Sequence, residues 1–364
     1  MNYNILKDQI KDKAIEFGFL EAKISSIIID QHAQSKFAEF IYNGYAGEMA
    51  YLKNNQNLRY HPAELHPTTL AIISVKMPYL SAKINRHQQR LKDSNHAYVS
   101  SYALGRDYHK VVKQQLQKYA QWINQRLATH QLEQNYRVFT DSAPIMEVQL
   151  ATQAGNGWRG KNTLLINKNH GSMFFLGELF TSLPLPPDEA TTQHCGSCQK
   201  CLEICPTQAF VTPYVLDARK CIAYLTIENP GAIPVELRSK IGNRIYGCDD
   251  CQLFCPWNKF SQLSPLNDFT PRNQLDSSSL LELFTWSETE FKQRLQGSPI
   301  LRIGYQAWQR NIAVGLGNAA PSAAIQQALE LALAHASPLV AEHILWALEQ
   351  QSQLITKKNF VPYT

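Results

Sequence analysis

Residues 195–206 of this chain read CGSCQKCLEICP, and residues 247–258 read GCDDCQLFCPWN. All eight cysteines of the protein lie in the window that these two runs enclose. The spacing of the first run, C-x2-C-x2-C-x3-C-P, is typical of iron–sulfur proteins, in which its fourth cysteine ligates a second cluster. We therefore predict two 4Fe-4S clusters, one bound by Cys195, Cys198, Cys201 and Cys255, and the other by Cys205, Cys221, Cys248 and Cys251.

Zinc and disulfide bonds are the alternatives for so many cysteines. A structural zinc site generally uses two separated CxxC pairs, often with histidine. Here the first run places four thiols within eleven residues, which is too close for two tetrahedral sites. A chain of 364 residues can bury an ample core without disulfides, and nothing in it indicates secretion. Because a reducing compartment suits thiolates that bind iron, we expect a cytoplasmic protein.

The composition is that of a globular protein, with 44% hydrophobic and 18% charged residues, and the length predicts two or three domains. The N-terminus, MNYNILKDQIKDK, lacks a continuous apolar segment, and no later run reaches the ~18 apolar residues of a membrane helix. We therefore expect no membrane contact. Nothing in the sequence demands more than a monomer.

Basic residues are unevenly distributed along the chain. The formal net charge is +5, yet between residues 83 and 126 nine Lys or Arg face only two Asp. This surplus favours an anionic partner such as nucleic acid. The alternative is a solvated basic helix face that binds nothing. The nine residues are Lys83, Arg86, Arg90, Lys92, Arg106, Lys110, Lys113, Lys118 and Arg126.

Strands and helices alternate over the first 190 residues. Residues 1–60 have helical spacing with one short extended piece, and apolar runs predict strands at 70–80, 96–105, 135–142 and 171–183. A helix is predicted from Asp107, with one apolar and one basic face, and another from Pro144 to Gly155. The alternation predicts an α+β or α/β layered domain over residues 1–190.

Asp141 lies where the strand at 135–142 gives way to the helix that follows. Such strand ends carry working side chains in layered α/β folds, but Asp is also a leading N-cap residue, and from local sequence alone the capping role is favoured. The next segment, AGNGWRGKNTLLI, is glycine-rich without being a Walker or Rossmann motif. Close backbone approach to a ligand and a tight β-connection both explain it.

The C-terminal part predicts helices alone. A polar connector, NQLDSSS, leads into a segment in which WQRNIAVGLGN from Trp308 aligns with VAEHILWALEQ from Val340 at an offset of 32 residues. This period predicts a HEAT-like helical array, and an ordinary helical bundle is the alternative. The expected domains are residues 1–190, a ferredoxin-like segment at 191–268 that carries the clusters, and a helical domain at 280–364.

Several segments together resemble the epoxyqueuosine reductase family, over nearly the whole chain. They are YALGRDYHKV (102–111), FTDSAPIMEVQLATQAGNGWRGKN (139–162), GSMFFLGELFTSLPLPPD (171–188), CGSCQKCLEICPTQAF (195–210) and CIAYLTIENPGAIPVELRSKIGNRIYGCDDCQLFCPWN (221–258). The resemblance implies an oxidoreductase that converts epoxyqueuosine to queuosine in the anticodon loop of tRNA. It also implies a cobalamin, cob(I)alamin in the active form, held between the first domain and the cluster segment.

Residue by residue, the resemblance implies that Asp141 is the proton donor. Ala223 departs from the serine that is common in the family at this position, which puts one corrinoid contact in doubt. The positions that match segments lining the corrinoid or its pocket are Arg59, Tyr102, Asp141, Lys161, Ser172, Tyr224, Cys248, Asp249 and Asp250.

The implied reaction consumes two electrons and two protons and releases water. We expect Asp141 to be buried so that its pKa rises from about 3.9 and it keeps a proton near neutrality. The clusters would relay electrons from an external low-potential donor. A base taken out of the anticodon loop leaves flanking phosphates to be bound, and the candidates are Arg238, Lys240 and Arg244.

Two other functions also fit parts of this pattern. A reductive dehalogenase of small organohalides would share the corrinoid and the clusters, but the N-terminus has no twin-arginine signal. A non-catalytic electron-transfer module would need neither Asp141 nor a corrinoid.

Overall fold

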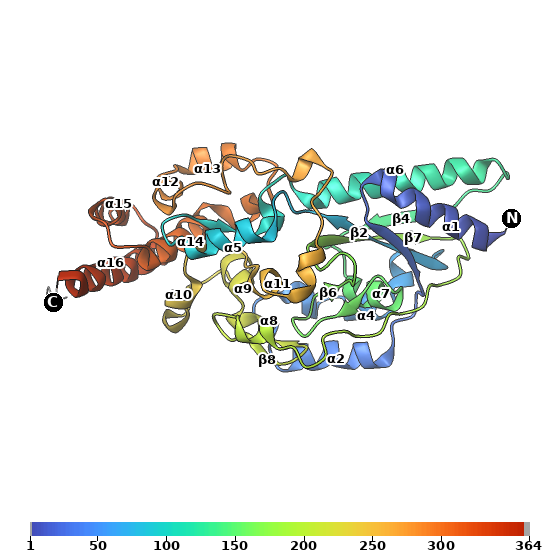
Figure 1. The fold of residues 1–364 in the computed structure, drawn as a ribbon, viewed down its shortest axis with the longest axis horizontal. Coiled ribbons are helices and arrows are strands. Elements are labelled where there is room, and N and C mark those ends of the chain that lie inside the picture. The colour runs from blue at the N-terminus through green and yellow to red at the C-terminus, as the bar shows by residue number, and fades with distance from the viewer. Residues whose placement is uncertain (1, 360–364) are drawn as a thin grey trace.

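The structure is a computed structural model that describes residues 2–359. The predicted C-terminal domain extends to residue 364, so its last five residues lie outside this range. The molecule is elongated, with a β-sheet near the N-terminus and the cysteine-bearing segment in the middle (Figure 1). At the other end lie the helices α14 (Gly304–Asn318), α15 (Ala323–Leu333) and α16 (Pro338–Asn359). None of the helices within residues 2–359 is both long and apolar enough to cross a membrane.

The sheet contains the strands β1 (Glu21–Ser25), β2 (Ala71–Pro78), β7 (Phe174–Thr181) and β4 (Tyr136–Phe139), in the order β1-β2-β7-β4. All three pairings are antiparallel, and β2 and β7 are paired from Ala71 and Thr181 to Pro78 and Phe174. The predicted layers are therefore present, but the antiparallel strands make the domain α+β rather than parallel α/β. The runs at 70–80, 135–142 and 171–183 do form strands, as predicted.

Helices cover both faces of this sheet (Figure 1). On one face α1 (Tyr3–Lys13) and α6 (Tyr108–Ala128) pack into the largest core of the N-terminal part. Gly177 of β7 allows α6 to come close, because a Cβ there would lie 2.9 Å from Leu116 Cδ1. On the other face α2 (Gln31–Tyr42) and α7 (Glu147–Gln153) form a smaller cluster with β2, β4 and β7.

Two local predictions in this domain need correction. The helix predicted from Pro144 begins at Glu147, because residues 141–146 form an irregular loop. The strand predicted at 96–105 is short: β3 is only Tyr98–Val99, and a 3-10 turn follows at Ser101–Ala103. The helix predicted from Asp107 is confirmed as α6, with Asp107 as its N-cap accepting from the backbone N–H of His109.

The glycine-rich run at 154–166 precedes the cysteine-bearing segment. It contains the hairpin β5 (Trp158–Arg159) and β6 (Leu165–Ile166), in agreement with the tight β-connection.

The cysteine-bearing segment consists of short elements. Its strand β10 (Arg244–Tyr246) pairs in parallel with β3, so the segment is attached to the N-terminal part by backbone hydrogen bonds. Its elements are α8 (Lys200–Glu203), β8 (Phe210–Thr212), β9 (Val215–Leu216), α9 (Ile222–Ile227), α10 (Val235–Ile241), β10 (Arg244–Tyr246) and α11 (Asp250–Leu253).

In the C-terminal part α14 (Gly304–Asn318) packs directly on α16 (Pro338–Asn359). Ile312 and Ile344, which the 32-residue offset aligns, are both fully buried in one core cluster. A HEAT-like repeat remains a prediction. The remaining helices are α3 (Ala50–Lys53), α4 (Gln56–Tyr60), α5 (Ile84–Lys92), α12 (Leu280–Phe284), α13 (Glu288–Arg294) and α15 (Ala323–Leu333).

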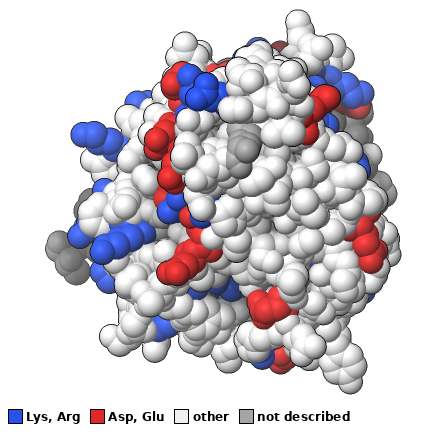
Figure 2. Space-filling model, turned by 90° about the vertical axis from the view of Figure 1, so that its right-hand side faces the viewer, with Lys and Arg blue, Asp and Glu red and all other residues white. Residues whose placement is uncertain are grey.

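One hydrophobic core crosses the predicted domain boundaries. It joins residues 97–104 of the N-terminal part, residues 218–246 of the cysteine-bearing segment and residues 275–347 of the helical part. The three predicted domains therefore share packing, and their limits at 190 and 268 remain predictions. Seen from the sheet end, acidic and basic side chains mix toward one side of the molecule, and much of the visible face is uncharged (Figure 2).

Candidate functional site

The eight cysteines are all free, and several of them influence one another's pKa. Burial raises the pKa of the Cys201 thiol to about 11, and the neighbouring charges of Cys255, Cys195 and Cys198 add to this rise. Burial also raises the pKa of Cys251 well above its usual value, with further contributions from Cys221, Cys205 and Cys201. The thiols that influence one another are thus largely those of the two predicted ligand sets, and Cys201 and Cys251 lie where the sets adjoin.

The first set, which contains Cys195 and Cys198, lies nearer the surface. Trp158 donates its indole N–H to Cys195 Sγ at 3.4 Å. The Lys161 amine donates to the carbonyls of Gly196 at 2.7 Å and Cys198 at 3.0 Å. Among the eight cysteines only Cys198 is exposed. An N–H aimed at a sulfur and a cation beside the loop are contacts of the kind that surround the sulfurs of iron–sulfur clusters.

The second set lies deeper, against a network of buried carboxylates. Arg244 donates to both oxygens of Asp250, at 2.7 and 2.5 Å. Asp249 accepts from the hydroxyls of Tyr98, Ser100 and Ser101 and from the Ser101 backbone N–H. Burial raises the pKa of Cys248 well above its usual value, and the Asp250 charge adds to this. Iron would have to displace these protons on binding.

Asp141 lies in a strained loop between β4 and α7. Its φ of 55° is in the left-handed region, which is uncommon for a residue other than glycine. Its backbone N–H donates to Glu147 Oε1 at 2.7 Å. The N-cap position of α7 is Met146, with no capping side chain. The capping interpretation of Asp141 is therefore wrong, and its carboxyl group, with the side chain 56% exposed, is free for another role.

The carboxyl group of Asp141 receives two hydrogen bonds from α6. Tyr108 donates its hydroxyl to Oδ2, and His109 Nε2 lies 3.2 Å from the same oxygen. The other ring nitrogen of His109, Nδ1, is 2.8 Å from Asp107 Oδ1, so an imidazole links the two carboxylates. The side chains of residues 107–109 thus form a hydrogen-bonded network that ends on Asp141.

The protonation states in this hydrogen-bonded network differ from the prediction that the pKa of Asp141 is raised. Burial alone would raise the pKa of Asp141, but the hydrogen bonds from His109 and Tyr108 outweigh it, and the pKa is lowered. Burial opposes the charged form of His109, yet its bonds to Asp107 and Asp141 raise its pKa to about 9. The expected raised pKa of Asp141 is therefore wrong for this state: near neutrality the proton resides on His109.

Further ionisable groups lie around Asp141. Burial and the charge of Asp141 raise the pKa of Glu147 to about 8. Arg302 pairs with Glu228 at 2.7 Å, and its charge also lowers the pKa of Asp141. Burial and the charges of Glu228 and Asp141 raise the pKa of Tyr51 to about 12. These groups come from four separate stretches of the chain, around residues 51, 141–147, 228 and 302, and their charges act on one another, so they lie together around Asp141.

Two of the predicted corrinoid residues belong to this neighbourhood. Arg59 is buried and donates to the carbonyls of Ile145 and Tyr51, at 3.4 and 3.3 Å. The ring of Tyr102 lies edge-on to that of Tyr108, with ring centroids 5.7 Å apart.

The other predicted residues lie elsewhere. Lys161 is at the loop of the first cysteine set, and Ser172 bonds with Asn258 and Gln252 in the cysteine-bearing segment. The Tyr224 hydroxyl accepts from the backbone N–H of Glu48 at 2.9 Å.

The candidate phosphate contacts need correction. Arg238 is 2% exposed, donates to the Ile233 carbonyl and pairs with Glu342. Arg244 is 9% exposed and engages Asp250. Neither guanidinium can reach a phosphate in this state, because each is buried against its own partners. Only Lys240 of the three is exposed.

Sequence reasoning missed His109 and Tyr108, which the quoted run YALGRDYHKV contains but to which no role was given. The available signal was their position in the first turn of a predicted helix, directly after its N-cap. The sequence near Glu228 and Arg302 does not indicate that they pair, because 74 residues separate them.

Eight free cysteines in the spacing of a two-cluster protein, and a carboxylate held by an imidazole and a phenol, are together the features of an iron–sulfur oxidoreductase. The sequence family described as 4Fe-4S double cluster binding domain matches residues 194–258, and the family described as Epoxyqueuosine reductase QueG, DUF1730 matches residues 59–142.

The chain is similar over nearly its whole length to curated proteins. It is 49% identical to the epoxyqueuosine reductase of Pseudomonas aeruginosa over 96% of this chain and 95% of the relative. It is 48% identical to that of Escherichia coli over 96% of this chain and 91% of the relative. The chain belongs to the epoxyqueuosine reductase family.

Solved structures agree with this assignment. A crystal structure of an epoxyqueuosine reductase with an epoxyqueuosine-modified tRNA-Tyr stem loop matches with a TM-score of 0.84 and 25% identity, over 100% of this chain and 96% of that one. The Bacillus subtilis enzyme, with its catalytic aspartate loop swung out of the active site, matches with a TM-score of 0.82 and 25% identity, over 98% and 94%.

Proposed function

We propose that this protein reduces epoxyqueuosine to queuosine at the wobble position of tRNA. The relatives that match nearly the full chain are epoxyqueuosine reductases, and one solved neighbour holds a modified tRNA stem loop. The observation that carries the proposal is Asp141, held by Tyr108 and His109 in the same chain as two sets of cluster cysteines. Such a site joins a proton supply to an electron supply, and the reaction needs two of each.

We propose cobalamin as the group that meets the substrate. When bound it supplies a strongly nucleophilic, low-valent cobalt. The buried Nε of Arg59 has no partner within residues 2–359, and Tyr51, whose carbonyl Arg59 engages, is 53% exposed, so this part of the site offers a free hydrogen-bond donor to a ligand. Arg59 and Tyr102, which lie near Asp141, would hold it there, and the roles of Tyr224, Cys248, Asp249 and Asp250 rest on the family resemblance alone.

The chain's own residues handle the protons. Removal of the epoxide oxygen as water breaks two C–O bonds, forms one C=C bond and consumes two protons with the two electrons. His109 is protonated near neutrality and lies 3.2 Å from Asp141 Oδ2. Asp141 can therefore take up a proton from His109 and deliver it to the departing oxygen, while Asp107 orients the ring through Nδ1.

The cysteine sets define a direction for the electrons. The first set includes the exposed Cys198, so we propose that it receives electrons from an external low-potential donor. The second set is buried beside Asp249 and Asp250 and would be the inner cluster. We propose that Lys161 and Ser172 support the cluster segment, since their polar atoms bond within it or to it.

The test is incubation of the reduced, cobalamin-loaded protein with epoxyqueuosine-containing tRNA, followed by mass spectrometry of the nucleosides. We expect loss of one oxygen mass, absent when reductant is omitted. A persistent epoxide with protein that carries both clusters would refute the proposed function. Because thiolates that bind iron need reducing surroundings, we expect this reaction in the cytoplasm.

A further inference from the structure

The exposed face of α6 is an acid-free row of cations. Over its 21 residues α6 contains Lys110, Lys113, Lys118 and Arg126, but no Asp or Glu. A shallow hollow of about 560 Å³ follows this face and is lined by Lys110, Lys113, Gln114, Gln117, Lys118 and Gln121. None of these three lysine amines has a hydrogen-bond or ion-pair partner within the described part of the chain. Lysines without carboxylate partners are available to an external anion.

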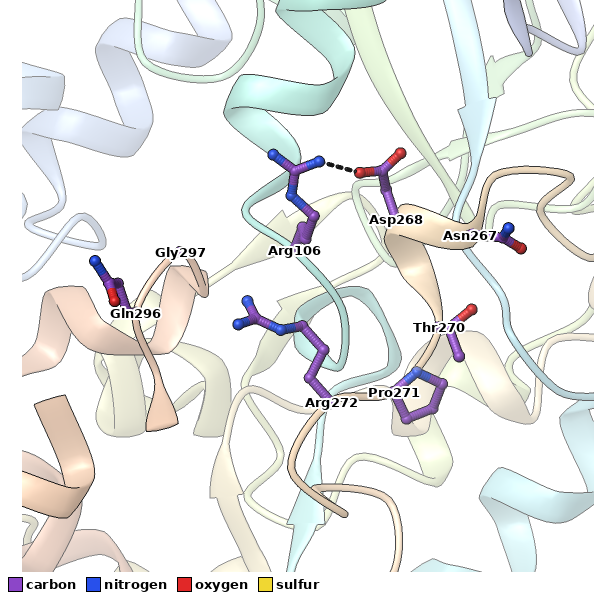
Figure 3. A pocket seen from close by; sticks show the side chains of 8 residues that line it. All are labelled: Arg106, Asn267, Asp268, Thr270, Pro271, Arg272, Gln296 and Gly297. Atoms are coloured by element: carbon purple, nitrogen blue, oxygen red, sulfur yellow. Dashed lines mark hydrogen bonds and ion pairs between the residues drawn. The ribbon is translucent and has the colours of Figure 1, made fainter. Parts of the chain in front are cut away.

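A second hollow, of about 510 Å³, lies just before the start of α6 (Figure 3). It is lined in part by Arg106, Thr270, Arg272 and Gln296. Arg106 pairs with Asp268, and its side chain is 55% exposed. The Arg272 guanidinium has no partner among residues 2–359 and points into the open space between the two loops (Figure 3). An exposed ion pair contributes little to stability, so Arg106 can exchange Asp268 for another anion.

Hydrogen bonds connect both hollows to Asp141. The backbone N–H of Asp107 donates to the Gly297 carbonyl in the wall of the second hollow, at 2.7 Å. The Asp107 carboxylate bonds to His109, which in turn bonds to Asp141. Lys110 is the next residue of α6. A polymer that places one base at Asp141 therefore has its neighbouring backbone within reach of the start of α6.

The phosphate contacts expected from the sequence are not available in this structure. Arg238 and Arg244 are buried against their own carboxylates. The row from Lys110 to Gln121 spans about 16 Å at ~1.5 Å per residue. The glutamine side chains between the lysines of this row offer neutral hydrogen-bond donors, and the lysine amines offer positive charges. Together they suit a row of phosphates. A compact acidic protein would not require such a narrow, linear row.

We infer that the exposed face of α6, together with Arg106 and Arg272, binds the sugar-phosphate backbone of the RNA next to the base presented to Asp141. This inference rests on the proposed function and adds a place on the chain for the phosphates. Phosphate contacts position the RNA without reading its sequence, so modified and unmodified stem loops bind this surface alike.

The experiment measures binding of the epoxyqueuosine-containing anticodon stem loop, by fluorescence anisotropy over a salt series, to the protein with both clusters. The variant is Lys113→Gln with Lys118→Gln, because Gln has a helix propensity close to that of Lys. The matched control is Lys36→Gln on α2, on the other face of the sheet, where Lys36 pairs with Glu39. Cluster absorption and the thermal midpoint verify that each variant is folded.

Each phosphate contact adds about 0.9 to the slope of log Kd against log salt concentration. The loss of one such contact therefore raises Kd roughly tenfold at ~0.1 M salt. We expect the double variant to bind about 10- to 100-fold more weakly with a slope lower by about 2, and Arg272→Gln to lose about tenfold. Lys36→Gln should bind as the wild type does.

A double variant with wild-type affinity and slope would overturn the inference. So would a double variant that loses affinity for an acidic electron carrier while keeping that for RNA. Failure of the proposed function is distinguishable from both, because wild-type protein would then bind RNA and still leave the epoxide intact.

Discussion

The protonation of His109 yields a prediction that can be worked out from the structure. His109→Gln keeps a donor near the position of Nε2, and hence the hydrogen bond to Asp141, but removes the proton that titrates. In the wild type the pKa of His109 is raised from 6.5 to about 9, against the cost of burial, by its bonds to Asp107 and Asp141. At ~1.4 kcal/mol per pKa unit, this rise in the pKa of His109 corresponds to a free energy of about 3 kcal/mol that favours its charged form in the folded protein. Since the Asp141 side chain is 56% exposed, solvent screening reduces the figure to about 1–2 kcal/mol.

The sign follows from the raised pKa. The acid form of His109 is present below about pH 9 and is lost above it, so the single-turnover rate should be sustained below pH 9 and fall about tenfold per pH unit above it. The stability that the pair contributes is fully present below pH 6.5 and is lost as pH rises through about 9. His109→Gln should therefore lower the thermal midpoint at pH 6.5 and have little effect at pH 10.

The assay is oxygen loss from epoxyqueuosine in RNA, in a single turnover with pre-reduced protein, from pH 6.5 to 10. A positioned general acid contributes about 10²- to 10⁴-fold, so His109→Gln should be at least about 100-fold slower at pH 7 and lack the alkaline fall. His32→Gln, on the exposed face of α2, is the matched control and should keep the wild-type profile. An unchanged alkaline fall in His109→Gln would refute the assignment of the proton to His109.

Three further changes test other parts of the site. Asp141→Asn should keep both clusters by absorption spectroscopy and lose turnover at least about 100-fold; full activity would remove Asp141 from proton transfer. Arg244→Met should lower the thermal midpoint, because a buried carboxylate left without its cation costs about 3–5 kcal/mol, and an unchanged midpoint would contradict the buried pairing. Gly47→Ala should destabilise the protein more than Gly304→Ala: both have positive φ, but only at Gly47 does the added Cβ collide, 2.5 Å from the Tyr224 hydroxyl. Equal midpoints for these two would argue against that contact.

The predictions that held depend on local sequence signals. Strands β2 and β7 and the amphipathic α6 follow from apolar runs and helical spacing, which the neighbouring residues alone determine. The prediction of two clusters follows from the cysteine spacing and agrees with the family match at residues 194–258, whereas the division of the cysteines into two ligand sets stays a prediction.

Two of the predictions that failed depend on contacts between distant residues. Arg238 reads as a surface cation next to Lys240, yet its partner Glu342 is 104 residues away. The capping prediction for Asp141 failed for a local reason: its N–H donates to Glu147, six residues later, where α7 begins. The charge state of Asp141 depends on His109, which comes from another element 32 residues earlier.

The parallel pairing of β3 with β10 has a consequence for synthesis on the ribosome. Tyr98 must wait for Arg244, and Val99 for Tyr246, before the two strands can pair. At ~5–20 residues per second the ribosome needs on the order of ten to thirty seconds to make the intervening chain. During that interval residues 97–104 lack the core that later covers them. All eight cysteines are also translated before α14 and α16. The eight cysteines are therefore synthesised before the part of the chain that completes this core.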